Sequence, residues 1–312
     1  MVNTKVVVIG AGNVGGSFLY AAINQGIASS YGIIDNNKKL REGQILDFED
    51  SIWNSQKDFR IFTCDYQDLK DADFVIITAG SSQNNAKSRL DGIEKSIAMM
   101  KNIAKQVKKS GFKGFTIIAS NPLDIMVYTY LKITKISKNK VIGTGTLLDT
   151  ARLRILISQK LQVSPKSVEA FTLGEHGDTS FSIFSEIRIG GVPFKNLEKI
   201  HGINSSNYES LLDDVVRKRG FEIVSRKSST NYGIGQALTK ILSAIVYDSQ
   251  EVLPISTYLE GEYGYNDVCI SVPAIVGKDG VQKILEHPMN KKERQKFKKS
   301  IEFIKSFNKQ YV

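Results

Sequence analysis

The chain has 312 residues, of which 41% are hydrophobic and 24% charged, a composition typical of a globular protein of one large or two modest domains. No apolar run is long enough to cross a bilayer, and the amino-terminal residues form a strand pattern rather than a signal peptide. The two cysteines, Cys64 and Cys269, are isolated in the sequence, which indicates buried thiols in a reducing compartment. We therefore expect a cytoplasmic protein.

The formal net charge is +10 and the sequence pI is about 9.3. Such a balance can indicate binding to nucleic acid, to anionic membranes or to anionic small molecules. The lysines gather in two stretches, 101–113 and 291–309, both at helical spacing. We interpret these stretches as the solvated outer faces of two helices. We expect neither nucleic acid nor membrane as a partner.

The first part of the chain alternates between short apolar runs and amphipathic stretches. Four unbroken, β-branched runs predict strands buried on both faces, as in a parallel sheet: Lys5–Gly10, Tyr31–Asp35, Phe74–Thr78 and Phe115–Ser120. Helical periodicity lies between them, at Val14–Gln25, Lys39–Ser51 and Gly92–Lys109. This order predicts a doubly wound, parallel-sheet Rossmann domain over residues 1–143.

From residue 144 the pattern is mixed α/β, which predicts a catalytic and substrate-binding domain over residues 144–312. We expect helices at Leu148–Gln162, Asn207–Val224, Gln236–Gln250 and the basic tail. We expect strands at Ser180–Pro193, turning at Gly190–Gly191, and at Asp267–Val276. No Ser/Gly-rich or charged linker separates the two parts, so we expect them to pack tightly.

A glycine-rich segment, Gly10-Ala11-Gly12-Asn13-Val14-Gly15, follows the first predicted strand and opens a helix. In this context the glycines allow a tight turn, close approach of a pyrophosphate, and close helix–strand packing. Asp35 ends the second strand, where an acid accepts hydrogen bonds from ribose hydroxyls and repels a 2′-phosphate. Asn36 and Asn37 add no positive charge, so NAD is favoured over NADP. A merely structural glycine turn is the alternative.

One of only three histidines, His176, stands between glycines in Gly174-Glu175-His176-Gly177-Asp178. A histidine can give and take a proton near neutral pH, as reversible carbonyl reduction requires. Asp149 and Arg152 are three residues apart on a predicted helix and therefore share one face. An acid there can orient the imidazole, and an arginine can hold a carboxylate through two hydrogen bonds. A surface ion pair within one helix is the alternative.

A small, polar segment, residues 80–89, follows the strand Phe74–Thr78 at the carboxyl edge of the predicted sheet. A loop at this position can close over a cleft, expel water and bring Arg89 to polarise a carbonyl. Asn121 ends another strand at the same edge, where its amide can reach a cofactor or substrate. We assign Val14, Gly80 and Ser120 to the cofactor site as well, and we expect no metal.

With these residues assembled, the sequence resembles the L-lactate/malate dehydrogenase family over nearly its whole length. The matching segments occur in order: GAGNVG, Asp35, the loop from Gln83 to Arg89, SNPLD, LLDTAR, LGEHGD, Thr230 in KSSTNYG, and STYLEGEYG. The resemblance implies that His176 is the acid–base residue with Asp149 as its partner. It implies the remaining roles too: Arg152 as carboxylate clamp, Arg89 as carbonyl-polarising residue, Asn121 as nicotinamide and substrate contact, Thr230 in the substrate pocket, and Tyr66 near the adenine.

The substrate is indicated by one position, six residues before Arg89. Malate enzymes carry arginine there, whereas this chain has Gln83, which leaves a second substrate carboxylate unpaired. The sequence therefore favours pyruvate and L-lactate over oxaloacetate and malate. Similarity to 2-hydroxyisocaproate dehydrogenases leaves open a preference for bulkier 2-oxo acids. A non-catalytic binding protein that kept the Rossmann fold is an alternative of another class.

The resemblance also bears on regulation and assembly. Arg154 matches an arginine that binds fructose 1,6-bisphosphate in allosteric bacterial relatives, but Glu169 stands where those relatives have a histidine. A glutamate repels a bisphosphate, so activation is expected to be weak or absent. The family resemblance further implies a homotetramer.

Overall fold

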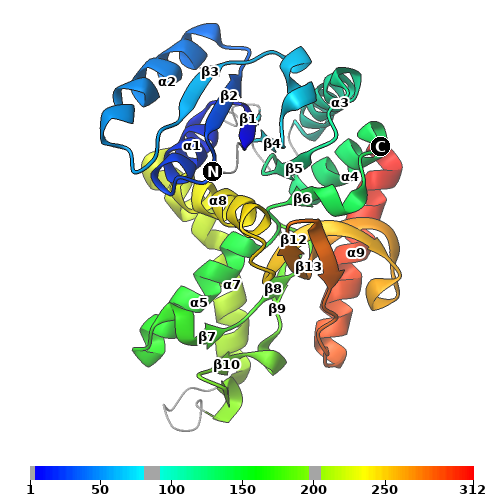
Figure 1. Ribbon diagram of the computed structural model, residues 1–312. Helices are drawn as coiled ribbons and strands as arrows, with labels where there is room; N and C mark the ends of the chain where they lie inside the picture. The colour runs from blue at the N-terminus through cyan, green and yellow to red at the C-terminus, as the bar shows by residue number, and fades with distance from the viewer. Residues whose placement is uncertain (1–3, 81–91, 197–204) are drawn as a thin grey trace.

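A computed structural model of the chain describes residues 4–80, 92–196 and 205–312. Its centre is one nine-stranded sheet with the order β14-β13-β12-β6-β5-β4-β1-β2-β3. Figure 1 shows the first strands of the chain at one end of the molecule and α5, α7, β7 and β10 at the other. Within the described residues, no helix is both long and apolar enough to span a membrane.

Six parallel strands form one side of this sheet, and the order 3-2-1-4-5-6 is that of a dinucleotide-binding fold. They are β1 (Lys5–Ile9), β2 (Ser30–Ile34), β3 (Arg60–Thr63), β4 (Phe74–Ile77), β5 (Phe115–Ile118) and β6 (Val141–Gly143). The connecting helices are α1 (Asn13–Asn24), α2 (Lys38–Asp50), α3 (Ile93–Ser110) and α4 (Leu123–Thr134). Short 3₁₀ turns lie at η1 (Ile52–Asn54), η2 (Tyr66–Asp71) and η3 (Lys138–Lys140).

The second half of the chain extends the same sheet. Strand β12 (Glu251–Glu260) pairs antiparallel with β6, so that Ser256 lies opposite Gly143. Strands β13 (Asn266–Gly277) and β14 (Gly280–Ile284) follow as antiparallel neighbours. The division expected at residue 143 therefore falls at the end of a strand whose two neighbours come from opposite halves of the chain.

The remaining elements of the second half are helices and short strands. The helices are α5 (Leu147–Leu161), α7 (Ser205–Lys227), α8 (Tyr232–Val246) and α9 (Lys291–Tyr311), of which α8 packs on α1 and α9 on α4. Strands β7 (Val168–Glu169), β10 (Arg188–Ile189) and β11 (Val192–Pro193) form one small sheet, and β8 (Thr172–Leu173) and β9 (Phe181–Ser182) another. The 3₁₀ turns η4 (Pro165–Ser167), η5 (Phe184–Glu186) and η6 (Glu262–Gly264) complete this half.

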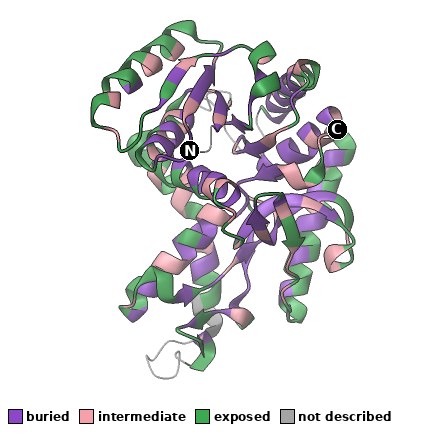
Figure 2. Ribbon diagram, viewed as in Figure 1, coloured by how far each residue is buried: buried purple, intermediate pink, exposed green. Residues whose placement is uncertain are grey.

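Alternation along β1 shows how the sheet is buried on both faces. Val6 and Val8 pack into one cluster with residues of α1 and α8, whereas Val7 and Ile9 pack into a second cluster with residues of α3 and α4. Successive side chains of a strand point to opposite faces, so a continuous apolar run is what two covered faces require. Figure 2 shows the central strands buried and the outer faces of the helices exposed.

The predicted doubly wound parallel sheet is confirmed, and its four predicted strands lie within two residues of β1, β2, β4 and β5. Strand β3 is an edge strand of only four residues, and β6 has three, which is too short for a pattern to stand out. Helix α4 was missed because it is buried nearly all round and so lacks an amphipathic stripe. Strand β12 was missed too.

Two predicted segments of the second half need correction. The hairpin expected over Ser180–Pro193 is confined to β10 and β11, where Gly190 and Gly191 take the positive φ angles of its turn. A 3₁₀ turn precedes it. The helix expected at Gln236–Gln250 begins earlier, at Tyr232, and ends at Val246. Residues 247–250 are outside it because Asp248 and Gln250 have left-handed backbone angles.

Gly235 tests how closely α8 packs on α1. A Cβ at this position would lie 2.8 Å from the carbonyl carbon of Ser17 and 3.0 Å from the nitrogen of Phe18. Because both atoms belong to the backbone, we expect Gly235→Ala to lower the free energy of unfolding by about 1–3 kcal/mol. Gly43→Ala is the matched control, since its Cβ would meet nothing within 4 Å. Helix propensity should make that variant more stable by roughly 0.5–1 kcal/mol. Urea unfolding compares them, and equal effects would contradict the packing argument.

Candidate active site

The glycine turn, residues 10–15, joins β1 to α1, and each of its glycines is required on different structural grounds. Gly10 has a φ of 102°, and a Cβ there would meet the nitrogen of Ala79 at 2.6 Å. A Cβ at Gly15 would lie 2.1 Å from the carbonyl oxygen of Gly10. A Cβ at Gly12 would meet no protein atom within 4 Å. The turn is thus closed toward the protein and open at Gly12, which fits the approach of a pyrophosphate.

Asp35 follows β2 and lies beside this turn. Its Oδ2 accepts a hydrogen bond from the backbone nitrogen of Ala11 at 2.7 Å, and its Oδ1 accepts one from Asn37 at 2.8 Å. The carboxylate therefore joins the end of β2 to the glycine turn. Each oxygen keeps a second lone pair, so ribose hydroxyls can still donate to it.

Asp149, Arg152 and His176 meet in the second half of the molecule. Asp149 and Arg152 lie on α5, and His176 lies in the segment between β8 and β9. Asp149 Oδ2 is 2.8 Å from His176 Nδ1, and its Oδ1 accepts a hydrogen bond from Arg152 Nη1 at 3.0 Å. Each carboxylate oxygen therefore has its own partner, and the sequence prediction of a shared helical face agrees with this geometry.

The three side chains differ in how far they are exposed to solvent. The side chains of Asp149 and Arg152 are 8% and 10% exposed, whereas that of His176 is 23% exposed. Arg152 Nε is buried and has no hydrogen-bond partner in the described structure. A buried guanidinium nitrogen without a partner is costly unless a ligand satisfies it. Arg152 therefore retains an unsatisfied donor among the described residues, and the His176 ring is the most exposed of the three side chains.

Charges shift the pKa values of this pair in opposite directions. Burial lowers the pKa of His176, but the carboxylate of Asp149 and its hydrogen bond outweigh burial, so the pKa lies above its ordinary value. Burial raises the pKa of Asp149, but His176 and Arg152 outweigh that effect and hold it below the usual range. The pair is thus set to carry an imidazolium beside a carboxylate near neutral pH.

The segment that carries His176 is fixed to its surroundings by the backbone and by neighbouring side chains. Gly174 forms an isolated antiparallel bridge with Ser271 of β13. Glu175 Oε2 accepts hydrogen bonds from the nitrogen and hydroxyl of Thr179, at 3.0 and 2.8 Å. Ser300 of α9 donates its hydroxyl to the Thr179 carbonyl at 2.7 Å. The imidazole is therefore carried on a rigid support.

One further group contacts this segment, Asp124, and Ser256 supports it in turn; sequence reasoning missed both residues. The nitrogen of His176 donates to Asp124 Oδ2 at 2.7 Å, and the hydroxyl of Ser256 donates to Asp124 Oδ1 at 2.6 Å. Asp124 stands in the SNPLD segment as the only acid of a largely apolar helix, and that isolation was the signal available in the sequence. Ser256 carried no signal, because it belongs to the strand that was missed.

The other predicted site residues lie around the carboxyl edge of the sheet. Ser120 is buried after β5 and donates its hydroxyl to the Ala79 carbonyl, at 2.5 Å, while Asn121 next to it is exposed. Thr230 lies between Ser229, which accepts from Asn13 at 3.0 Å, and Asn231, which donates to Ser17 at 2.8 Å. Partly buried Val14 and Tyr66 and exposed Gly80 follow β1, β3 and β4.

Two predicted residues, Gln83 and Arg89, lie outside the described residues. Within the described ranges, no group of His, Cys, Asp and Glu side chains is suited to hold a metal ion. Arg154, the residue compared above with a bisphosphate-binding arginine, already has protein partners. Its Nε donates to the Ala170 carbonyl at 3.1 Å, and its guanidinium lies over the ring of Phe171.

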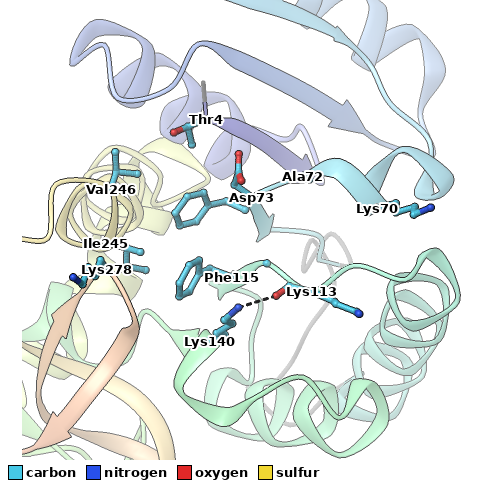
Figure 3. A pocket seen from close by; sticks show the side chains of 12 residues that line it. Thr4, Lys70, Ala72, Asp73, Lys113, Phe115, Lys140, Ile245, Val246 and Lys278 are labelled. Carbon is cyan, nitrogen blue, oxygen red and sulfur yellow. Dashed lines mark hydrogen bonds between the residues drawn. The ribbon is translucent and has the colours of Figure 1, made fainter. Parts of the chain in front are cut away.

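A separate hollow of about 400 Å³ lies at the opposite edge of the sheet (Figure 3). It is lined at the amino ends of the strands, by Phe74 and Phe115 among others, and by lysines: Lys70, Lys113, Lys140 and Lys278. Lys140 donates to the Lys113 carbonyl at 3.1 Å, and Figure 3 shows Lys70 and Lys113 extending away from it. The ammonium groups do not converge on one point. The hollow lies at the amino ends of the strands, and His176 is not among the residues that line it.

Comparison with known proteins agrees with this geometry. Residues 4–143 match the model of the lactate/malate dehydrogenase NAD-binding domain, and residues 146–311 match that of the lactate/malate dehydrogenase α/β C-terminal domain. The chain belongs to the lactate/malate dehydrogenase family. The resemblance stated from the sequence and the expected cofactor, NAD, are confirmed.

Individual members of the family are similar over almost the whole chain. An L-lactate dehydrogenase of Mesomycoplasma hyopneumoniae strain 232 is 47% identical over 300 residues, which cover 96% of this chain and 95% of the relative. One from Mycoplasma pneumoniae is 45% identical, covering 98% and 97%. The crystal structure of the ligands-bound minor L-lactate dehydrogenase from Enterococcus mundtii has a TM-score of 0.95 at 38% identity, and 99% of each chain is covered.

Substitutions at Gly12 and Gly15 should affect different properties, namely cofactor binding and stability of the fold. We expect Gly12→Val to weaken NADH binding at least about tenfold, with an unchanged melting temperature, because its side chain fills only the space open to a ligand. Gly15→Val should lower the melting temperature, since its Cβ overlaps the Gly10 carbonyl. NADH fluorescence titration and thermal unfolding measure the two effects. Normal NADH affinity in a folded Gly12→Val variant would contradict the assignment.

Proposed function

We propose that the chain is an NAD-dependent L-lactate dehydrogenase that interconverts a small 2-oxo acid, pyruvate, and the corresponding L-2-hydroxy acid. The observation that carries this proposal is the contact of His176 and Arg152 with the two oxygens of one buried carboxylate, Asp149. That arrangement supplies a proton donor and a carboxylate clamp side by side. L-lactate dehydrogenases at 47% and 45% identity support the substrate.

The residues divide the reaction between them. NADH, when bound at the glycine turn, supplies the hydride that reduces the carbonyl carbon. The Arg152 guanidinium binds the substrate carboxylate. The His176 imidazolium donates its Nε2 proton to the carbonyl oxygen, while Asp149 holds the proton on Nδ1. In the opposite direction neutral His176 accepts the proton of the hydroxyl group.

The remaining assignments follow the family resemblance. We assign Arg89 to polarising the carbonyl, and Gln83 to the far end of the substrate pocket. Asn121 contacts the nicotinamide and substrate, and Thr230 lines the pocket beside the glycine turn. The hydrogen bonds of Ser229 and Asn231 to α1 support that last placement.

We also propose a cytoplasmic homo-oligomer, a tetramer by resemblance. Large apolar side chains are exposed on α1, α2, η1, α7 and α8: Tyr20, Leu46, Trp53, Phe221 and Tyr232. Such exposure is unusual for a monomer and is relieved by a second copy of the chain. A monomeric mass in light scattering would exclude this assembly.

Substrate choice tests the proposed function directly. NADH absorbance should fall when pyruvate is added, and His176→Asn should reduce kcat/KM by about 10²-fold or more because the proton donor is lost. Gln83→Arg should move the preference toward oxaloacetate by adding the charge that a second carboxylate needs. A panel of larger 2-oxo acids measures side-chain breadth. Faster turnover of oxaloacetate than of pyruvate by the unaltered enzyme would indicate a malate dehydrogenase, and no turnover a binding protein.

The pH profile tests the Asp149–His176 pair. Reduction requires the imidazolium, so kcat/KM for pyruvate should fall as the pH rises through the elevated pKa of His176. Asp149→Asn removes the group that raises this pKa, so the falling limb should move to lower pH. The rate near pH 7 should drop by about 10²-fold. Rates measured from about pH 5 to about pH 9 compare the two proteins. A limb that stays in place would rule out the pairing as the cause.

A further inference from the structure

Asp124 is a carboxylate buried in a place where a charge is costly. It lies in the first turn of α4, three residues after Asn121, and is only 2% exposed. An acid at the start of a helix ordinarily faces solvent and interacts with the helix dipole. Removing a carboxylate from water costs several kcal/mol unless specific partners compensate. Its partners therefore show what it does.

Those partners come from two segments far away in the sequence. One oxygen of Asp124 accepts from the nitrogen of His176 at 2.7 Å, and the other from the hydroxyl of Ser256 at 2.6 Å. Asp124 thus connects three parts of the molecule: the helix that follows Asn121, the strand that joins the two halves of the sheet, and the segment of the acid–base residue.

His176 is consequently held at two points. Asp149 fixes the ring through Nδ1, and Asp124 fixes the backbone from which the ring projects. A displacement of about 1 Å in a reacting group can cost 10²-fold in rate. We propose that Asp124 is a positioning residue that fixes the backbone of His176 and brings a second carboxylate to the residue that carries the imidazole. The inference rests on the proposed function for its effect on rate.

The electrostatics of the surroundings support the second part of this role. Burial raises the pKa of the Asp124 carboxyl to about 7, against the opposing hydrogen bonds from Ser256 and His176. The titratable groups that interact with Asp124 are Glu175 and His176 on the facing segment and Cys269 on β13. After Asp149, the charge of Asp124 contributes to raising the pKa of His176. Loss of this charge therefore lowers the pKa of the imidazole.

Two substitutions distinguish the effect of Asp124 on the position of His176 from the effect of its charge. Asp124→Asn keeps an oxygen for the His176 nitrogen and an amide group for the Ser256 hydroxyl, but removes the charge. We expect its kcat/KM for pyruvate at acidic pH to stay within about threefold of the unaltered enzyme, and the falling limb to move to lower pH by roughly half a pH unit. Asp124→Ala removes the support as well, and kcat/KM should fall about 10- to 100-fold at every pH.

A nuclear magnetic resonance titration of the histidine ring protons provides a readout independent of turnover. The chain has only three histidines, and His176→Asn identifies the signal of His176. In Asp124→Asn this signal should titrate at lower pH. Asp213→Asn is the matched control: Asp213 is 4% exposed and accepts from the nitrogen of Ser182 at 3.0 Å, so it is a buried carboxylate on another backbone nitrogen. It should leave the His176 titration unchanged.

The outcomes distinguish this inference from the proposed function. Failure of the unaltered enzyme to reduce pyruvate would overturn the function, while the titration of His176 would still test the role of Asp124. An unchanged His176 titration in Asp124→Asn would overturn the inference, as would an Asp124→Ala enzyme that is less stable but turns over normally.

Discussion

The Asp149 carboxylate is the interaction on which the site depends. It is nearly out of contact with water, and its charge is tolerated because Arg152 and His176 each occupy one of its oxygens. Removing either partner would leave a buried charge uncompensated. The same contacts fix the position of the imidazole relative to the guanidinium. Stability of the buried carboxylate and alignment of the imidazole with the guanidinium therefore have one physical origin.

Sequence patterns located most of the architecture because burial leaves a clear trace in the parallel strands. Lys5–Ile9 and Phe74–Ile77 are continuous apolar runs, and the glycine turn and Asp35 follow their strands at the expected spacing. Patterns failed where an element is very short, as in β6, or buried nearly all round, as in α4. The pairing of β12 with β6 was also beyond reach, because strand order between distant segments depends on packing rather than on local periodicity.

The candidate site shows the same division. Motif spacing brought forward Asp149, Arg152 and His176, since each belongs to a segment with distinctive composition. Asp124 and Ser256 were not recognised, because a single acid in an apolar helix and a serine in a strand have ordinary local explanations. Their contacts span 52 and 132 residues of sequence, which only the folded chain defines. Residues in segments of distinctive composition carry local signals, whereas residues that support those segments from elsewhere in the chain are recognised only in the tertiary structure.

The shared sheet has a consequence for synthesis of the chain. During synthesis, Gly143 of β6 is made before its neighbour Ser256 of β12. The core cluster that contains Val6 and Val8 is likewise incomplete until α8 has been made. At a translation rate of about 5–20 residues per second, the intervening segment of roughly one hundred residues takes several seconds or more to appear. During that interval the nascent first half presents an unpaired strand edge and an uncovered apolar face, the features most prone to association with other chains. The first half can therefore complete its sheet and its core only after α8 and β12 have been synthesised.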